Sequence, residues 1–563
     1  MRLAIFHYHL RPGGVTGVIT QASIAIGRHL GEVVDEVILV SGSEDNTDRV
    51  VDRITRDAPQ LSVCAHVHHE LGYVSQQNGV SLSALQRRIE DLLRGNYLGH
   101  DTVWWVHNYQ LGKNPAFTAA LINILETNPV QRAVLQIHDF PECARFENLD
   151  FLRSHVSSPV YPLNKNIAYA TINERDREIL VAAGVPQNSV YALPNPVPPK
   201  PAGRQSAIGA GPGSDGELTR EAVLSRLNEA FGSRFPSFDP DGMLFLYPVR
   251  GIRRKNVLEA AFLTKLFNAS AGRRANMLVT LPGASPQEKP YWDLVAAAYS
   301  DGTIPGMGGI GAELEPIGVE FGDLMRTADL VVSTSVQEGF GYAFFEAPMW
   351  GRPLLARYLD VLAGLDHLFE AAACSFYSGL RVPFESPSID SIRAILRIRY
   401  DEQLERAAQH LPRSARERLE AEVEEMLSDH TIDFSFLMAQ IQYSYTKDLA
   451  DSVFANDVRS LNPEVLEPMM RLTEEGDTGG AAPDMSELGY PAYAERVGNL
   501  LSDLTAYHNA TGASKRSEPP PYKDGPHAHG HRRGVGTDPV QAQLLEAFAH
   551  KDYFRLLYRS VGE

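Results

Sequence analysis

The feature that most constrains the fold is a repeated alternation of short apolar runs with longer stretches of helical periodicity. Runs rich in β-branched and aromatic residues occupy residues 3–8, 36–40, 62–67, 102–106, 133–137, 167–172 and 189–193. Such alternation is typical of a mostly parallel sheet covered by helices on both faces. The first 200 residues are therefore predicted to form one Rossmann-like domain.

A second set of such units follows a stiff proline segment, LPNPVPPKP, at residues 193–201, which cannot continue a helix. Further strands are expected at residues 243–248, 276–281, 330–334 and 353–356. A chain of 563 residues is also too long for one hydrophobic core. We predict Rossmann-like domains at residues 1–200 and 243–440, separated by an insert at 201–242 that contains one short helical pattern, TREAVLSRLNEAF.

The C-terminal third has a weaker pattern. Residues 441–538 are expected to be a helical and low-complexity extension, with partial disorder or a long surface loop after residue 474. The histidines of HAHGH at residues 527–531 could bind a metal, but a solvated low-complexity tract is the preferred interpretation. Apolar spacing predicts a last helix within residues 539–563, which could pack back on the first domain.

Charge and composition exclude several classes of protein. The net charge of −18 argues against a general binder of nucleic acid or anionic lipid. No apolar run is long enough to predict a transmembrane helix, and the opening MRLAIFHYHL fits a first strand better than a secretory signal. Three widely spaced cysteines suit neither a disulfide framework nor a zinc site, so a cytoplasmic location is expected.

Residues 329–357, DLVVSTSVQEGFGYAFFEAPMWGRPLLAR, form a strand, glycine loop, helix and strand pattern. The loop EGFG offers backbone N–H groups to an anion at the helix start. Glu338 and Glu346 flank that place, and carboxylates beside a phosphate are unfavourable unless they bind something else. Sugar hydroxyls can donate to them, so the segment predicts a nucleotide-sugar site; the alternative is two ordinary surface glutamates.

Two other loops offer groups for a diphosphate. Gly13 and Gly14 follow the first strand and would let a ligand approach the backbone closely, although a plain strand-to-helix turn is the alternative. The second domain opens with PVRGIRRKN, which places Arg250, Arg253, Arg254 and Lys255 together before a helix. Cations at a helix start are unfavourable unless an anion lies among them, so a phosphate site is predicted, with a solvated basic turn as the alternative.

Polar residues also follow the buried strands of the first domain. His138 and Asp139 come after VLQI, and Asp139 could fix the tautomer of the histidine. His107 and Asn108 come after VWWV and could line the acceptor side, as could Arg145 in the loop HDFPECARF if the acceptor is anionic. Structural histidines and a surface arginine are the alternatives.

The glutamates in EGFGYAFFEA, with seven residues between them, resemble the paired-glutamate motif of the retaining GT-B glycosyltransferases of family 4. The resemblance extends over roughly residues 1–360. It implies two Rossmann-like domains facing a cleft, with the acceptor bound by the first domain and the donor mainly by the second. It also implies retention at the anomeric carbon and no need for a metal.

The resemblance further implies roles for individual residues. Arg250 and Lys255 would grip the donor diphosphate, Glu338 would hold sugar hydroxyls, Glu346 the ribose, and His138 the sugar. The loop residues that would bind the donor are Gly13, Gly14, Gly339, Phe340 and Gly341.

The predicted function is transfer of a hexose from a nucleotide-diphosphate sugar to a soluble hydroxyl acceptor. UDP-glucose is the first candidate donor and GDP-mannose the second. A GT-B phosphorylase or epimerase, and a sugar-nucleotide-binding or scaffolding protein without turnover, stay open as alternatives. A hydrolase with two carboxylates is disfavoured, because both glutamates would lie beside phosphate on one face. Asp239 and Asp241 match a metal-binding D-x-D pattern, but Pro240 and Gly242 predict a turn instead.

Overall fold

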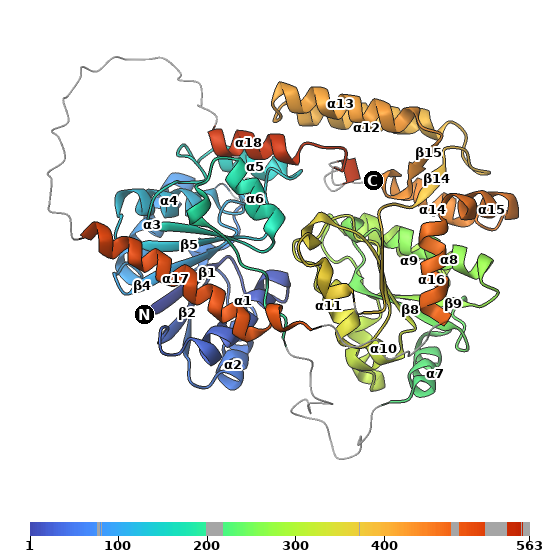
Figure 1. The fold of residues 1–563 in the computed structure, drawn as a ribbon, viewed down its shortest axis with the longest axis horizontal. Helices are drawn as coiled ribbons and strands as arrows, with labels where there is room; N and C mark the ends of the chain where they lie inside the picture. Colours follow the sequence, from blue (N-terminus) through green and yellow to red (C-terminus); the bar gives the residue numbers. More distant parts are fainter. Residues whose placement is uncertain are drawn as a thin grey trace. The chain divides into compact units, whose positions relative to one another are not determined.

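The computed structural model describes residues 1–75, 79, 81–198, 218–370, 372–474, 484–512, 538–552, 554 and 555. The chain divides into two compact units (Figure 1). Unit 1 comprises Met1–Pro198, His410–Pro412 and Met485–Phe548, and unit 2 comprises Pro199–Gln409, Arg413–Asp484 and Ala549–Glu563. The predicted end of the first domain at residue 200, the first part of the insert at residues 201–217 and the HAHGH tract lie outside the described residues.

Unit 1 is built on a parallel sheet of seven strands in the order β3-β2-β1-β4-β5-β6-β7. Its strands are β1 (Arg2–His7), β2 (Glu36–Ser41), β3 (Ser62–Val67), β4 (Thr102–His107), β5 (Arg132–Ile137), β6 (Ile167–Thr171) and β7 (Val190–Ala192). Each strand overlaps one of the seven predicted runs. The alternation in the sequence therefore located the whole sheet of this unit.

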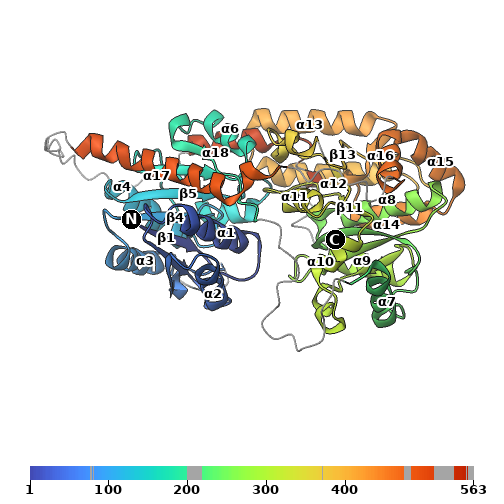
Figure 2. The ribbon, with the colours of Figure 1, turned by 60° about the horizontal axis from the view of Figure 1, so that its bottom comes forward.

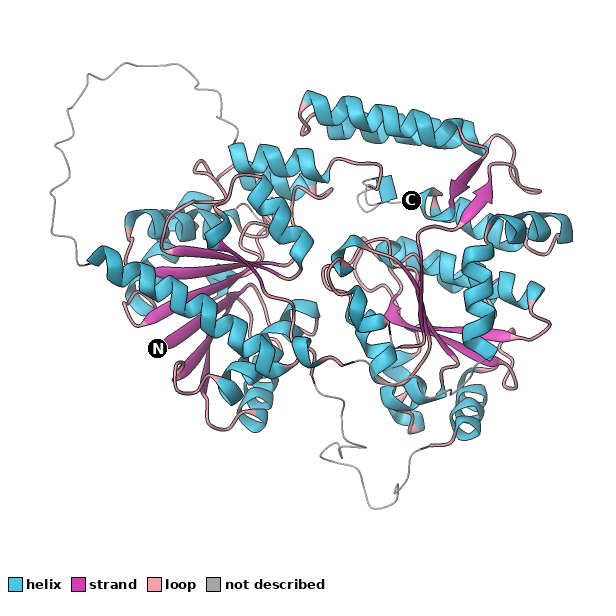
Figure 3. Ribbon diagram, in the orientation of Figure 1, coloured by secondary structure: helices cyan, strands magenta, loops and turns pink. Residues whose placement is uncertain are grey.

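Helices cover both faces of this sheet, as Figure 3 shows. One face packs against α3 (Leu82–Asn96), α4 (Pro115–Thr127) and α18 (Pro539–Phe548). The other packs against α1 (Gly14–His29), α2 (Thr47–Asp57) and α17 (Tyr490–Gly512). Successive side chains of a strand point to opposite faces, and accordingly Trp104 of β4 lies in the first core and Trp105 in the second. Two shorter helices, α5 (Phe146–Arg153) and α6 (Glu174–Ala182), complete the unit.

Helix α17 corrects, at Tyr490–Gly512, the prediction of partial disorder or a long surface loop in residues 474–538, of which 475–483 and 513–537 lie outside the described residues. It runs beside α1 (Figure 2) and belongs to unit 1. Tyr493, Val497 and Leu500 are fully buried in the core between α17 and the sheet. Their spacing of four and three residues forms one apolar face of a helix, a pattern obscured in the sequence by the glycine- and proline-rich segments on both sides.

Unit 2 contains a parallel sheet of six strands in the order β10-β9-β8-β11-β12-β13. The strands are β8 (Met243–Arg250), β9 (Ala275–Leu281), β10 (Gly306–Gly308), β11 (Leu330–Ser333), β12 (Leu354–Arg357) and β13 (Cys374–Tyr377). Strands β10 and β13 are not among the strands predicted from the sequence. In β10, Gly306 adopts φ 126°, and a Cβ there would lie 2.1 Å from the Met277 carbonyl oxygen. This strand is therefore defined by close backbone pairing with β9 and not by an alternation of apolar side chains.

The helices of unit 2 surround this sheet and continue beyond it. They are α7 (Arg220–Phe231), α8 (Val257–Ser270), α9 (Lys289–Ser300), α10 (Phe321–Thr327), α11 (Tyr342–Met349), α12 (Ile392–Ala408), α13 (Arg413–Ser428), α14 (Ala439–Asp448), α15 (Ser452–Leu461) and α16 (Pro463–Glu474). Helices α12 and α13 pack against each other, and a small antiparallel sheet pairs β14 (Arg381–Pro383) with β15 (Thr431–Asp433). Unit 2 extends past the predicted boundary at residue 440.

The two parallel sheets confirm the α/β class and the pair of Rossmann-like domains that a GT-B fold requires. In the described part of the chain, no helix combines the length and apolar character needed to span a membrane.

Candidate functional site

The glutamate loop of unit 2 leaves β11 and enters α11 through a left-handed turn. Gly341 precedes the helix at φ 79°, and a Cβ at this position would lie 2.4 Å from Phe344 Cδ2. Glycine is therefore required here both by the backbone conformation and by the ring beneath it. The Val336 N–H donates to the Arg254 carbonyl at 2.9 Å, so the glutamate loop lies directly against the basic loop that follows β8.

Glu338 binds two cations of that basic loop. Its carboxylate accepts hydrogen bonds from Lys255 Nζ and, at 3.0 Å, from Arg254 Nη1. Burial by itself would raise the pKa of Glu338, but Lys255 and Arg254 outweigh it and lower the pKa to about 2. Burial lowers the pKa of Lys255, while Glu338 opposes that effect. The loop thus holds an ionised group in which Glu338 and Lys255 are largely buried and Arg254 is one-third exposed. With two cations and one carboxylate, this group carries a net positive charge.

Glu346 lies about one turn into α11 and is mostly buried. Burial raises its pKa, and the nearby Lys255 opposes the shift. Lys255 therefore acts electrostatically on both glutamates of the motif, which the structure brings to one side of the sheet.

Arg250 is placed differently from Lys255. Its guanidinium pairs with Glu288 at 3.4 Å and is 45% exposed, whereas the Lys255 side chain is 14% exposed. The cation beside Lys255 on Glu338 is Arg254, which the sequence analysis named only as a member of the basic run. Four basic residues in six positions signalled a cationic loop, but only the turn at residues 253–255 decides which of them face Glu338.

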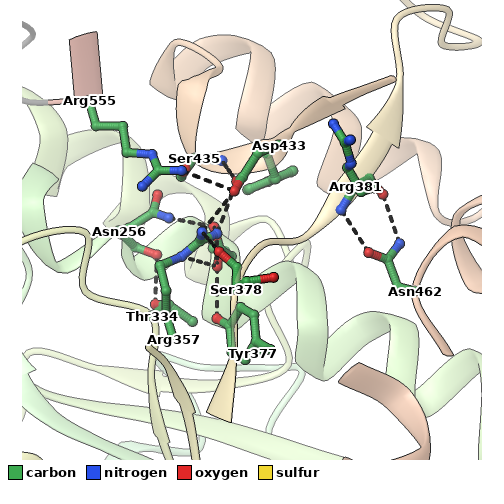
Figure 4. A network of polar contacts seen from close by, with 12 residues as sticks. Asn256, Thr334, Arg357, Tyr377, Ser378, Arg381, Asp433, Ser435, Asn462 and Arg555 are labelled. Atoms are coloured by element: carbon green, nitrogen blue, oxygen red, sulfur yellow. Dashed lines mark hydrogen bonds and ion pairs between the residues drawn. The ribbon is translucent and has the colours of Figure 1, made fainter. Parts of the chain in front are cut away.

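A buried polar network contacts this loop at Asn256 (Figure 4). Asn256, next to Lys255, adopts φ 51° and donates to Glu259 at 2.6 Å. Glu259 pairs with Arg357 at 2.7 Å, and Arg357 pairs with Asp433 at 2.8 Å. Arg555, from the C-terminal segment, completes the network at 3.2 Å from Asp433. Its members lie far apart in the sequence, and no local pattern predicts them.

Two histidines meet at the carboxyl edge of the unit 1 sheet. His107 is the last residue of β4 and His138 follows β5. Their rings stack, with His107 Nδ1 2.8 Å from His138 Nε2. The His138 backbone N–H also donates to Asn108 Oδ1 at 2.8 Å. Burial lowers the pKa of His138 to about 4, against the opposing effect of Asp139, and it lowers the pKa of His107 strongly. Both rings are therefore neutral at pH 7, and one N–H is shared between them.

The partner of the His138 ring is thus His107, which the sequence does not predict. Asp139, which the sequence analysis assigns to the tautomer of His138, forms an ion pair with Arg145 at 3.0 Å. The structure therefore gathers all four candidate acceptor residues, His107, Asn108, Asp139 and Arg145, at one edge of unit 1.

Gly13 and Gly14 begin α1 beside open space. A Cβ on Gly14 would meet no atom within 4 Å, and one on Gly13 would meet only the Arg11 carbonyl oxygen, at 3.8 Å. The start of α1 is therefore accessible to a ligand, although neither glycine has the positive φ that demands this residue. Phe340 packs on Phe345 at 5.0 Å between ring centroids and braces the loop next to Gly339.

The D-x-D pattern forms a turn. The Asp241 N–H donates to Asp239 Oδ1 at 3.1 Å, and the Gly242 N–H donates to the Asp239 carbonyl oxygen at 3.0 Å. Across the residues that the structure describes, no three or more His, Cys, Asp or Glu side chains are grouped as metal ligands.

No protein-family model matches the chain. It is 28% identical over 558 residues to the Mannosylglucosyl-3-phosphoglycerate synthase of Petrotoga mobilis (strain DSM 10674 / SJ95). The matched region covers 99% of each chain. The chain is an enzyme of the glycosyltransferase class.

Among solved structures, this glycosyltransferase is similar to the sucrose-phosphate synthase of Thermosynechococcus elongatus, with a TM-score of 0.44 and 12% identity over 90% of this chain and 99% of that chain. It is also similar to a structure described as trehalose-6-phosphate from E. coli bound with UDP-2-fluoro glucose, with a TM-score of 0.42 and 10% identity over 90% and 99% of the two chains.

Proposed function

We propose that the chain transfers a mannosyl group from a nucleotide-diphosphate sugar to a glucosylated 3-phosphoglycerate. The observation that carries the proposal is the buried group of Lys255, Arg254 and Glu338, with Glu346 beside it. Such a group holds a diphosphate on its cations and sugar hydroxyls on its carboxylates. The full-length relative supports the choice of acceptor.

The proposed donor follows from the relative's name. In a mannosylglucosyl group the mannosyl unit is the outer sugar, so we take it as the group added last. GDP-mannose, the second candidate from the sequence, then becomes the first to test, and UDP-glucose the second. A retaining, metal-independent reaction of the family 4 type is part of the same proposal.

In the proposed mechanism, Lys255 and Arg254 exchange their partner Glu338 for the donor diphosphate. In the loop, Glu338 pairs with both Lys255 and Arg254. A diphosphate would take over these cations, and the Glu338 oxygens would then accept hydrogen bonds from donor-sugar hydroxyls. The cations stabilise the charge that develops on the leaving phosphate. That phosphate takes the acceptor proton on the same face, so the configuration at the anomeric carbon is retained.

The experiment is a transfer assay with GDP-mannose, UDP-glucose and ADP-glucose against glucosyl-3-phosphoglycerate, with and without EDTA. We expect product from one donor, an anomeric configuration equal to that of the donor by NMR, and no effect of EDTA. Lys255→Gln should abolish transfer, and the exposed Arg274→Gln should retain it. Donor binding without turnover would instead indicate the non-catalytic alternative, and an inverted product would contradict the retaining mechanism.

A further inference from the structure

A second group of polar side chains surrounds the carboxyl edge of the unit 1 sheet, outside the histidine pair. We call it the cationic edge and define it as His9, Tyr73, Gln110, Lys113 and Arg145. His9 Nε2 lies 3.2 Å from the Tyr73 hydroxyl, and Lys113 Nζ lies 5.6 Å from the Tyr73 ring centroid. Gln110 Nε2 donates to the Asp139 carbonyl oxygen at 2.9 Å, which joins this group to the Asp139–Arg145 pair.

Positive charge exceeds negative charge at this edge. Arg145 has Asp139 as its counter-ion. Lys113 is half-buried, and in the described part of the chain no carboxylate lies within ion-pair distance of its Nζ. Burial and the neighbouring Arg145 lower the pKa of Lys113, with Asp139 opposing them. The Asp139 carboxylate is therefore the counter-charge shared by two cations, Arg145 and Lys113. An anionic ligand would stabilise this arrangement.

Buried polar atoms without partners lie at the same edge. Within the described residues, Gln110 Oε1, His7 Nδ1 and His9 Nδ1 have no hydrogen-bond partner, and the side chains of Gln110 and His7 are buried. The His7 ring lies 5.3 Å from the His9 ring and 6.3 Å from the His107 ring, between centroids. Buried polar groups normally find partners, so these atoms indicate a ligand that carries hydroxyl groups.

We infer that the cationic edge, together with the neighbouring His7, is the acceptor subsite, in which Lys113 and Arg145 hold a phosphate group while Gln110 and His7 bind sugar hydroxyls. This inference rests on the proposed function, and it names the residues that select a phosphorylated acceptor. Lys113 contributes a mobile point charge, and Arg145, held by Asp139, contributes a planar fork suited to phosphate oxygens.

The kinetic test compares two acceptors that differ only in the phosphate, glucosyl-3-phosphoglycerate and glucosylglycerate. Lys113→Gln should raise the KM for the phosphorylated acceptor at least tenfold and leave kcat, the KM for glucosylglycerate and the KM for the donor nearly unchanged. Arg56→Gln, on the exposed face of α2, is the matched loss of one cation in unit 1 and should change none of these values. Equal effects of Lys113→Gln on both acceptors, or no effect, would overturn the inference.

A binding experiment separates the inference from the proposed function. The affinity for 3-phosphoglycerate, measured by calorimetry, should fall at least tenfold in Lys113→Gln and stay unchanged in Arg56→Gln. If the wild type binds 3-phosphoglycerate through Lys113 but transfers no sugar, the subsite is supported and the proposed reaction is wrong. If the wild type and Lys113→Gln bind equally, or neither binds, the subsite is wrong whatever the outcome of the transfer assay.

Discussion

At the scale of single residues, Glu338 controls the charge of the donor loop. Its pKa of about 2 keeps it ionised, and its ion pairs stabilise the fold above its ordinary pKa of 4.5 and lose that effect as the pH falls toward 2. Glu338→Gln should lower stability by about 3–5 kcal/mol, because Lys255 and Arg254 then lose their buried counter-charge.

The same substitution, Glu338→Gln, should strengthen the binding of GDP although it weakens the fold. With Glu338→Gln the two cations are free for an anion, so GDP should bind several-fold more tightly and raise the melting temperature more than it does in the wild type. Turnover should fall by about 100-fold, because a contact to the reacting sugar is lost. Calorimetry and transfer assays measure both values; weaker GDP binding would contradict the partner exchange at Lys255.

The histidine pair of unit 1 predicts a pH dependence of stability. The pKa of His138 falls from 6.5 to about 4 on folding, so the unfolded chain binds the extra proton between these values. Stability is therefore complete above about pH 6.5 and decreases by up to about 3 kcal/mol as the pH falls to 4. In His138→Gln, the free energy of unfolding, measured in urea, should change less between pH 4 and 7 than in the wild type. The exposed His29→Gln should keep the wild-type dependence on pH.

At the scale of elements, the network behind the donor loop ties β12, α8, β15 and the C-terminal segment together. Arg357 is its centre, fully buried between Glu259 and Asp433. Arg357→Met should lower the free energy of unfolding by about 3–5 kcal/mol, since Glu259 then stays buried without a cation and Asp433 keeps only Arg555. Tyr377→Phe, which removes only the 2.8 Å hydrogen bond to Glu259, should lower it by about 1 kcal/mol. Equal losses in urea unfolding would contradict this view of the network.

At the scale of the whole molecule, unit 1 is completed by a helix from the C-terminal third of the chain. Leu500 of α17 is fully buried against α1 and the sheet. Leu500→Ala should destabilise unit 1 by about 2–5 kcal/mol and leave unit 2 unchanged, and the exposed Ser502→Ala should alter neither unit. Hydrogen exchange by mass spectrometry would resolve the two units; an equal loss of protection in both would show that they unfold together.

All seven strands of the unit 1 sheet and four of the six strands of the unit 2 sheet could be predicted from local sequence. Buried strands of a parallel sheet are apolar on both faces, so runs such as VWWV identify themselves without tertiary information. The turn at Gly341 and the pair of glutamates around it are likewise local. Strand β10 was missed, because its Gly-Met-Gly sequence has no strand signal and backbone pairing alone defines it.

Which groups lie together in the folded protein depends on contacts that no local pattern contains. The tertiary structure selected Arg254 as the cation beside Lys255 and placed Arg250 on Glu288. It also paired His138 with His107, docked α17 on unit 1, and closed the network from Glu259 to Arg555. These choices depend on contacts between residues distant in the chain, whose energies come from burial and exclusion of water. A local pattern shows which residue types are present in a loop, but it carries no information about the atoms that face them after folding.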